Sequence, residues 1–128
     1  MNHGTDARGI ENNQKDRTRT NMTTRLEKLN QMLEREPQDA FLNFGVAMEL
    51  VKAEDYAGAV ARFDRLLSID PDYTAGYHHK ALAQLALDRI AEAQATLEAG
   101  VEAARRVDNA HALAEMSELL ARVRATPR

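Results

Sequence analysis

Three histidines in the second half of the chain could support metal binding or proton transfer. His78 and His79 are adjacent, and His111 lies further along the sequence. Histidine is the commonest metal ligand and titrates near neutral pH. Adjacent residues on a helix point about 100° apart, so His78 and His79 cannot hold one ion as residues four apart would. His79 and His111 on neighbouring helices are a second possible arrangement for a metal site.

The sequence lacks the usual signatures of catalysis. The chain contains no cysteine, and therefore no thiol nucleophile, thiolate metal site or disulfide. It also contains no HExxH pair, no glycine-rich phosphate loop and no serine-centred nucleophile elbow. We therefore expect a protein that is not an enzyme and needs no cofactor. A histidine metal site is the second alternative, which calorimetry with zinc or nickel would test.

The elements that position the histidines follow a sequence repeat of 34 residues. Pro37 and Pro71 are 34 residues apart, and they end two similar stretches, LEKLNQMLEREP and VARFDRLLSIDP. When the chain is aligned with itself at this spacing, Leu29 matches Phe63 and Leu97. A fixed period of this length is typical of stacked helical hairpins, which bury their apolar sides against one another.

Each expected helix has its own start signal. Thr24 followed by Glu27 forms a capping box, and five aspartates stand where a helix could take an N-terminal cap. Apolar residues around Phe63 follow a spacing of three and four, so we expect Phe63 to be buried. The register predicts an all-α fold with a half repeat, two whole repeats and a closing helix that starts at Asp108. The five aspartates are Asp39, Asp55, Asp72, Asp88 and Asp108.

The residues at these offsets resemble the tetratricopeptide repeat, a helix-turn-helix unit with small, large apolar and proline residues at fixed positions. In the first whole repeat, which starts at Ala40, the matching residues are Val46, Ala47, Leu50, Tyr56, Ala59, Phe63 and Pro71. In the second, which starts at Thr74, they are Tyr77, Ala81, Ile90, Ala93, Leu97 and Gly100. The departures are Lys80, Gln84 and Arg105, the last at the place of proline. The resemblance covers roughly residues 24–123 and implies a short α-solenoid that binds other proteins.

The expected first helix of repeat one is apolar on two sides. One stripe consists of Leu42, Val46 and Leu50, and the other of Phe41, Phe44, Met48 and Val51. In tetratricopeptide proteins the first helices line a concave groove. The resemblance implies a largely apolar groove here, suited to an amphipathic helix or a short apolar peptide. Its predicted residues are Phe41, Phe44, Met48, Val51 and Lys52 in repeat one, and Ala75, His78, Leu82, Leu85 and Ala86 in repeat two.

Such a groove differs from the carboxylate-clamp variant of the family. That variant uses a lysine and an asparagine where this chain has Phe44 and Met48. Two alternatives compete with an open groove. The second stripe belongs to the core if its helix is central in the bundle. If the protein is a homodimeric assembly element, a second copy of the chain fills the groove. Phe44→Glu is expected to unfold the protein in the first case, and to abolish binding or dimerisation if the stripe is a surface.

The opening of the chain differs in composition from the rest. Residues 1–21 contain almost no apolar side chains, so we expect a disordered tail there and a helical domain over residues 22–128. Met22, directly before the capping threonines, is hypothesised to be the functional start. The mass of the native protein tests this idea, and an intact Met1 would contradict it.

Charge and hydropathy exclude two classes of partner. Residues 22–128 hold 13 lysines and arginines against 17 acidic residues, so the domain lacks the clustered basic charge that nucleic acid requires. No apolar run approaches the roughly 20 residues that span a bilayer, and the N-terminus has no apolar signal core. We expect a cytoplasmic adaptor or scaffold. Its protein partner, and the choice between monomer and dimer, are not encoded in these patterns.

Overall fold

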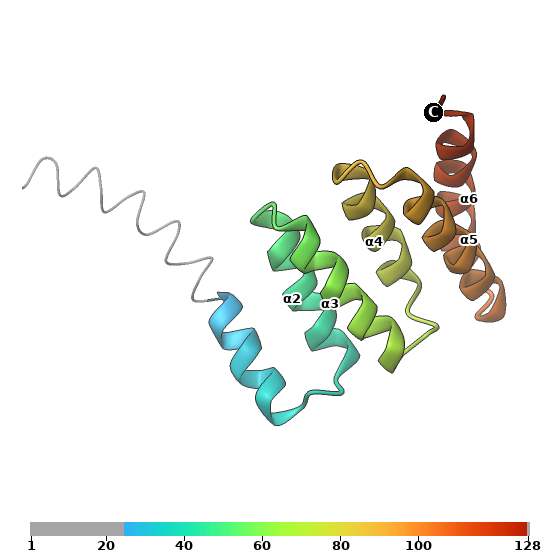
Figure 1. Ribbon diagram of the computed structural model, residues 1–128. Helices are drawn as coiled ribbons and strands as arrows, with labels where there is room; N and C mark the ends of the chain where they lie inside the picture. Colours follow the sequence, from blue (N-terminus) through green and yellow to red (C-terminus); the bar gives the residue numbers. More distant parts are fainter. Residues whose placement is uncertain (1–24, 128) are drawn as a thin grey trace, which may run out of the picture.

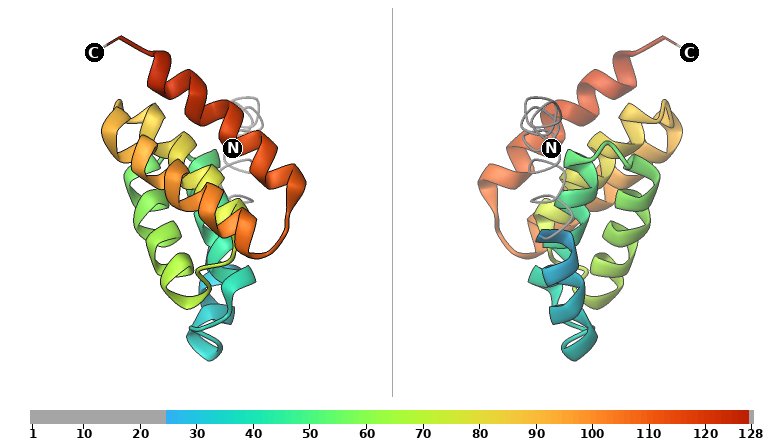
Figure 2. Two further views of the ribbon diagram at one scale, coloured as in Figure 1. Left: turned by 90° about the vertical axis from the view of Figure 1, so that its right-hand side faces the viewer. Right: turned by 90° about the vertical axis from the view of Figure 1, so that its left-hand side faces the viewer.

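The described part of the chain is a single row of helices. The computed structural model describes residues 25–127, and no strand occurs in that range. Figure 1 shows the helices side by side in chain order, and Figure 2 shows the stack from its two ends. A helix over residues 25–35 is followed by α2 (Ala40–Lys52), α3 (Tyr56–Ile69), α4 (Thr74–Ala86), α5 (Ile90–Arg106) and α6 (Ala110–Ala125). The predicted all-α solenoid is confirmed.

Some sequence predictions fall outside this range. The proposed tail, the start at Met22 and the capping residue Thr24 all lie outside the described residues. None of the helices described is long and apolar enough to cross a membrane.

Three apolar clusters hold the row together, because each helix packs on its neighbours in the chain. The first joins the helix at residues 25–35 to α2 through Leu33 and Leu42. The second joins α2 to α3 around Phe63, which is fully buried as predicted. The third joins α4, α5 and α6 around Leu97 and Met116.

The two second helices of the repeats differ in length because only one is followed by proline. Pro71 restricts Asp70 to an extended conformation (φ −135°, ψ 92°), and α3 ends at Ile69 after 14 residues. Arg105 stands at the equivalent place in the second repeat and allows α5 to continue, so α5 has 17 residues. Consequently α6 begins at Ala110. The prediction that the closing helix starts at Asp108 is wrong.

Two of the predicted caps are confirmed. Asp39 Oδ1 accepts a hydrogen bond from the Leu42 backbone N–H at 2.8 Å, and Asp55 Oδ1 accepts one from Gly58 at 2.9 Å. The other three aspartates do not cap helices. The residues at those N-caps are Tyr73, Arg89 and Asn109, of which Asn109 accepts a side-chain bond from Ala112 N–H at 3.0 Å.

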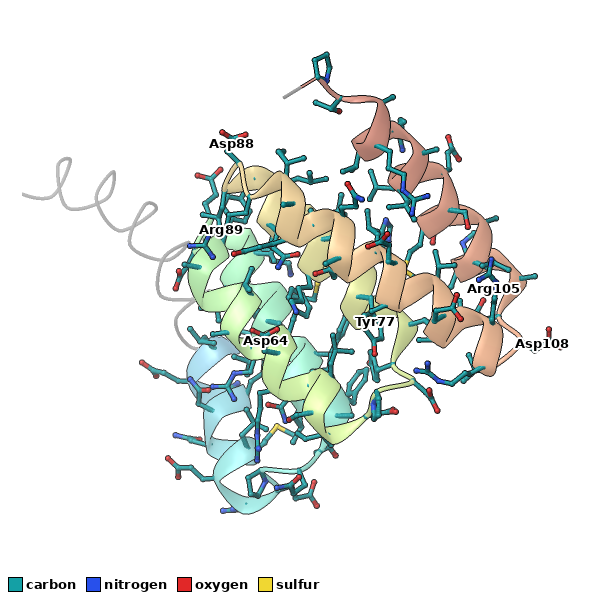
Figure 3. All side chains as sticks on the ribbon, turned by 45° about the vertical axis from the view of Figure 1, so that its right-hand side comes forward. Asp64, Tyr77, Asp88, Arg89, Arg105 and Asp108 are labelled. Carbon is teal, nitrogen blue, oxygen red and sulfur yellow. The ribbon has the colours of Figure 1, made fainter. Side chains whose placement is uncertain are left out.

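Asp88 and Asp108 end helices instead of starting them. Their φ angles are 59° and 56°, in the left-handed region, and Glu54 after α2 has a φ of 60°. Behind Asp88, the Arg89 N–H donates to the Gln84 carbonyl at 2.9 Å, which is the Schellman pattern of a helix C-terminus. Figure 3 shows Asp88 and Asp108 at the tips of their turns. Aspartate tolerates this conformation better than most residues, which is why the same residue type serves at both ends of a helix.

Candidate functional site

The first apolar stripe of α2 is core. Leu42 and Val46 are buried against the helix at residues 25–35, where they contact a cluster that includes Leu29 and Leu33. Leu50 is half-buried and packs on the same cluster. This stripe is therefore occupied by the N-terminal half repeat.

The second stripe of α2 is divided between packing and exposure. Phe44, Met48 and Val51 are half-buried and pack against the cluster around Phe63. Phe41, at the start of α2, is 73% exposed. Lys52 is also exposed and shares the carboxylate of Glu49 with Arg25, with Lys52 Nζ 3.6 Å from Glu49 Oε1.

The predicted groove residues of α4 occupy the equivalent positions of the next repeat. Leu82 is 41% exposed, Leu85 is half-buried, and Ala86 is exposed. Ala75 and His78 are half-buried near the start of α4. Six large apolar side chains at the predicted groove positions are at least partly exposed, and we call them the α2–α4 surface. They are Phe41, Phe44, Met48, Val51, Leu82 and Leu85.

An aromatic cluster fixes the position of Phe44. Its ring centroid lies 6.2 Å from that of Phe63, 5.3 Å from Tyr73 and 5.7 Å from His79. The His79 ring also stacks on Phe63, with centroids 6.4 Å apart. Phe44→Glu would place a charge against these rings, so unfolding of that variant would not reveal whether the surface beside it binds a partner.

Two side chains of this region have shifted proton affinities. Burial lowers the pKa of His79, the neighbouring His78 lowers it further, and Glu115 acts in the opposite direction. Burial raises the pKa of Tyr73, and the negative charges of Asp70 and Asp39 raise it further. Both shifts keep the rings of the cluster neutral near pH 7.

A cavity of about 310 Å³ lies between α4 and α6, next to this cluster. Asn109 Nδ2 donates to Thr74 Oγ1 at 3.4 Å across it, and His111 Nε2 lies 3.5 Å from Glu115 Oε1. The structure thus brings His79 and His111 to one cavity. Among residues 25–127, no group of three or more histidines and carboxylates is arranged to hold a metal ion. The lining consists of Thr74, Ala75, His78, His79, Asn109, His111, Ala112, Glu115 and Met116.

Sequence reasoning missed Thr74, Asn109 and Glu115 as members of this cavity. A signal for Glu115 was present, because it follows His111 by four residues on the closing helix, and residues four apart share a face. Thr74 and Asn109 carried no comparable signal, because turn polar residues are common at helix starts.

A larger cavity of about 390 Å³ lies between α5 and α6. Two ion pairs line it, Arg105 with Glu102 and Arg124 with Glu98, whose nitrogen–oxygen distances are 2.5 Å and 3.0 Å. Its charged groups are therefore already paired with one another, and none of the predicted groove residues lines it.

Comparisons with known proteins place this arrangement in a family. The model of the tetratricopeptide repeat matches residues 50–122. A tetratricopeptide repeat domain protein from Salinibacter ruber, solved in solution, is 29% identical, with a TM-score of 0.68 over 72% of this chain and 93% of that one. No curated protein matches the chain.

Two further solved structures share the same architecture. The TPR2B domain of yeast Sti1, solved in complex with pHsp70, is 25% identical, with a TM-score of 0.74 over 86% of this chain and 88% of that one. The type III secretion translocator chaperone SycD of Yersinia enterocolitica has a TM-score of 0.74 over 86% of this chain and 77% of that one, and at 14% identity it shows a shared fold alone. Because the family match covers more than half of the sequence and the helices stack as paired repeats, the chain belongs to the tetratricopeptide repeat family.

Proposed function

We propose that this domain is a non-catalytic protein-interaction module that binds an amphipathic helix or a short apolar peptide across the α2–α4 surface. The observation that carries the proposal is the exposure of two large apolar side chains, Phe41 at 73% and Leu82 at 41%, at predicted groove positions of successive repeats. The yeast TPR2B domain, which was solved with pHsp70, supports an interaction role for a domain of this architecture.

The half-buried residues of the surface would form a preformed floor for such a ligand. Phe44 is held by Phe63, Tyr73 and His79, so it does not have to be ordered when a peptide binds. A rigid surface loses less conformational entropy on binding than a mobile one. Full burial of a phenylalanine side chain contributes about 1.5–3 kcal/mol, so Phe41 alone can make a large contribution to affinity.

The proposal is tested with Phe41→Ser and Leu82→Ser, using Val107→Ser as the matched control. Val107 is 42% exposed but lies in the turn between α5 and α6, away from the α2–α4 surface. All three variants should keep the circular dichroism spectrum of the parent, and Leu82→Ser and Val107→Ser should lower the melting temperature by similar small amounts because the two residues are about equally exposed. Peptides selected from a random displayed library should lose binding to the first two variants and keep it with the control.

Equal binding by all three variants would contradict the proposal. Light scattering after size exclusion distinguishes the homodimeric alternative. A dimer that Phe41→Ser and Leu82→Ser dissociate, and Val107→Ser does not, would show that a second copy of the chain covers the surface.

A further inference from the structure

We propose that the cavity between α4 and α6 receives a lysine or arginine side chain of the peptide that binds the α2–α4 surface. This inference rests on the proposed function and adds the chemical class of the ligand. Three observations support it: the cavity adjoins the surface, its formal charge is negative, and its lining offers both a hydrogen-bond acceptor for a cation and apolar atoms for the methylene groups of a long side chain.

The cavity and the α2–α4 surface meet at α4. Ala75 and His78 belong to the predicted groove face of the second repeat and also line the cavity. His79, from the cavity lining, contacts the ring of Phe44, which lies within the surface. A peptide that crosses α2 and continues over α4 would therefore reach the cavity with its next side chains.

The formal charge of the lining favours a cation over an anion. With histidine counted as neutral, Glu115 carries the single formal charge among the residues that line the cavity. Its side chain is 47% exposed, and its present partner is His111, which is itself 86% exposed. A carboxylate entering the cavity would lie near a like charge, whereas an ammonium or guanidinium group could pair with Glu115.

Hydrogen bonding at the cavity is compatible with a cation, and the charge of Glu115 favours a cation over an anion. Asn109 is already engaged, since its Nδ2 donates to Thr74 and its Oδ1 accepts from Ala112 N–H. The neutral imidazole of His79 has one acceptor nitrogen beside its N–H, and lysine and arginine carry donors alone. The lowered pKa of His79 favours this neutral form.

The remaining lining suits the aliphatic part of a long basic side chain. Ala75, Ala112 and Met116 contribute apolar atoms that the methylene groups of lysine or arginine could contact. The volume of about 310 Å³ lies at the lower end of the range for ligand sites, about 300–1,000 Å³, and therefore has room for one side chain.

The experiment selects peptides from a random displayed library on the parent protein, Glu115→Gln and the control Glu92→Gln. Glu92 is an exposed residue in the first turn of α5 and is not part of the cavity. On the parent and the control, the selection should enrich lysine or arginine beside apolar residues. Glu115→Gln should lose this enrichment while still selecting apolar peptides, and its melting curve verifies that it is folded.

One enriched peptide is then synthesised with lysine, norleucine or glutamate at the enriched position, and each dissociation constant is measured by calorimetry. The lysine peptide should bind about two- to fivefold more tightly than the norleucine peptide, the ratio expected for a partly exposed ion pair. The glutamate peptide should bind more weakly than norleucine. The difference between lysine and norleucine should vanish in Glu115→Gln.

The outcomes separate this inference from the proposed function. Enrichment of apolar peptides without basic residues, or with acidic ones, overturns the inference and leaves the α2–α4 surface as a binding site. A lysine preference that persists in Glu115→Gln also overturns it. Enrichment of no peptide at all overturns the proposed function, and the inference fails with it.

Discussion

Gly100 provides a direct test of how closely the helices approach one another. It is buried on α5, where the sequence predicted close approach. A Cβ atom there would lie 2.5 Å from Met116 Sδ and 2.7 Å from Tyr77 Cβ. The methionine sulfur can move, but Tyr77 Cβ is fixed to the backbone of α4, so Gly100→Ala should force the two helices apart. Figure 3 shows Tyr77 within the stack beside α5.

The expected magnitude is the difference between two opposing effects. Overpacking a close contact costs roughly 1–3 kcal/mol, whereas replacing glycine with alanine inside a helix stabilises it by roughly 0.5–1 kcal/mol. Because one of the two clashing atoms is tied to the backbone, we expect the clash to dominate. Gly100→Ala should therefore lower the free energy of unfolding by about 1–2 kcal/mol.

Gly45→Ala is the matched control, for which we expect the free energy of unfolding to change in the opposite direction. Gly45 lies inside α2, and an added Cβ would meet Leu29 Cδ2 at 3.4 Å and Cδ1 at 3.6 Å, which are ordinary contacts. The helix propensity of alanine then acts alone, so this variant should be more stable by about 0.5–1 kcal/mol.

Thermal unfolding followed by circular dichroism measures both variants. In a domain of this size, about 1 kcal/mol corresponds to a shift in melting temperature of about 4–8 °C. The two substitutions should therefore move the melting temperature in opposite directions. If Gly100→Ala raised it as Gly45→Ala does, the close approach of α4, α5 and α6 would be refuted.

Three further predictions concern a turn, a titrating ring and a buried hydrogen bond. Asp88→Gly should raise the free energy of unfolding, measured in urea, by about 1 kcal/mol, because glycine adopts the left-handed φ of 59° without steric cost. An unchanged or lower free energy of unfolding would show that Asp88 is not strained. The pKa of His79 is lower in the folded protein than in the unfolded chain, so the unfolded chain binds a proton at a higher pH than the folded protein does. The free energy of unfolding should therefore decrease as the pH falls below about 6.5. His79→Gln should flatten this dependence between pH 7 and pH 5, whereas a slope equal to that of the parent would show that another group causes it. Thr96 Oγ1 donates to Gln84 Oε1 at 2.7 Å in the core, so Thr96→Val should cost about 1–3 kcal/mol of stability. Adding Gln84→Leu should recover part of that loss, and failure to recover any would mean that the pair is not coupled.

The order and pairing of the helices were predictable because spacing alone encodes them. Phe63 is apolar in a run with helical periodicity, and such a residue has to face its neighbours. Gly100 stands where the repeat needs a small residue, and the structure places Tyr77 and Met116 beside it. These inferences need only the period and the size of the side chain, which a single sequence contains.

Exposure within the second stripe of α2 was beyond prediction. Phe41 and Phe44 are three residues apart and share one side of the helix, yet Phe41 is 73% exposed and Phe44 is packed. The rings that hold Phe44 come from Phe63 in α3, from Tyr73 in the following loop and from His79 in the next repeat. Their positions depend on how successive repeats rotate against each other, and periodicity does not determine that rotation.

The position of Glu115 at the cavity between α4 and α6 follows from one departure from the repeat. At a constant spacing of 34 residues, Glu115 would align with Ala81 and Ala47, both of which are completely buried. Arg105 stands where the repeat expects proline, so α5 extends and α6 starts two positions later than the 34-residue spacing predicts. When α4 and α6 are aligned by their first residues, Glu115 corresponds to His79. A carboxylate that strict periodicity would bury without a partner thus lies at the cavity, beside His111. Loss of one helix-ending residue therefore changes both the length of a helix and the charge of the cavity next to it.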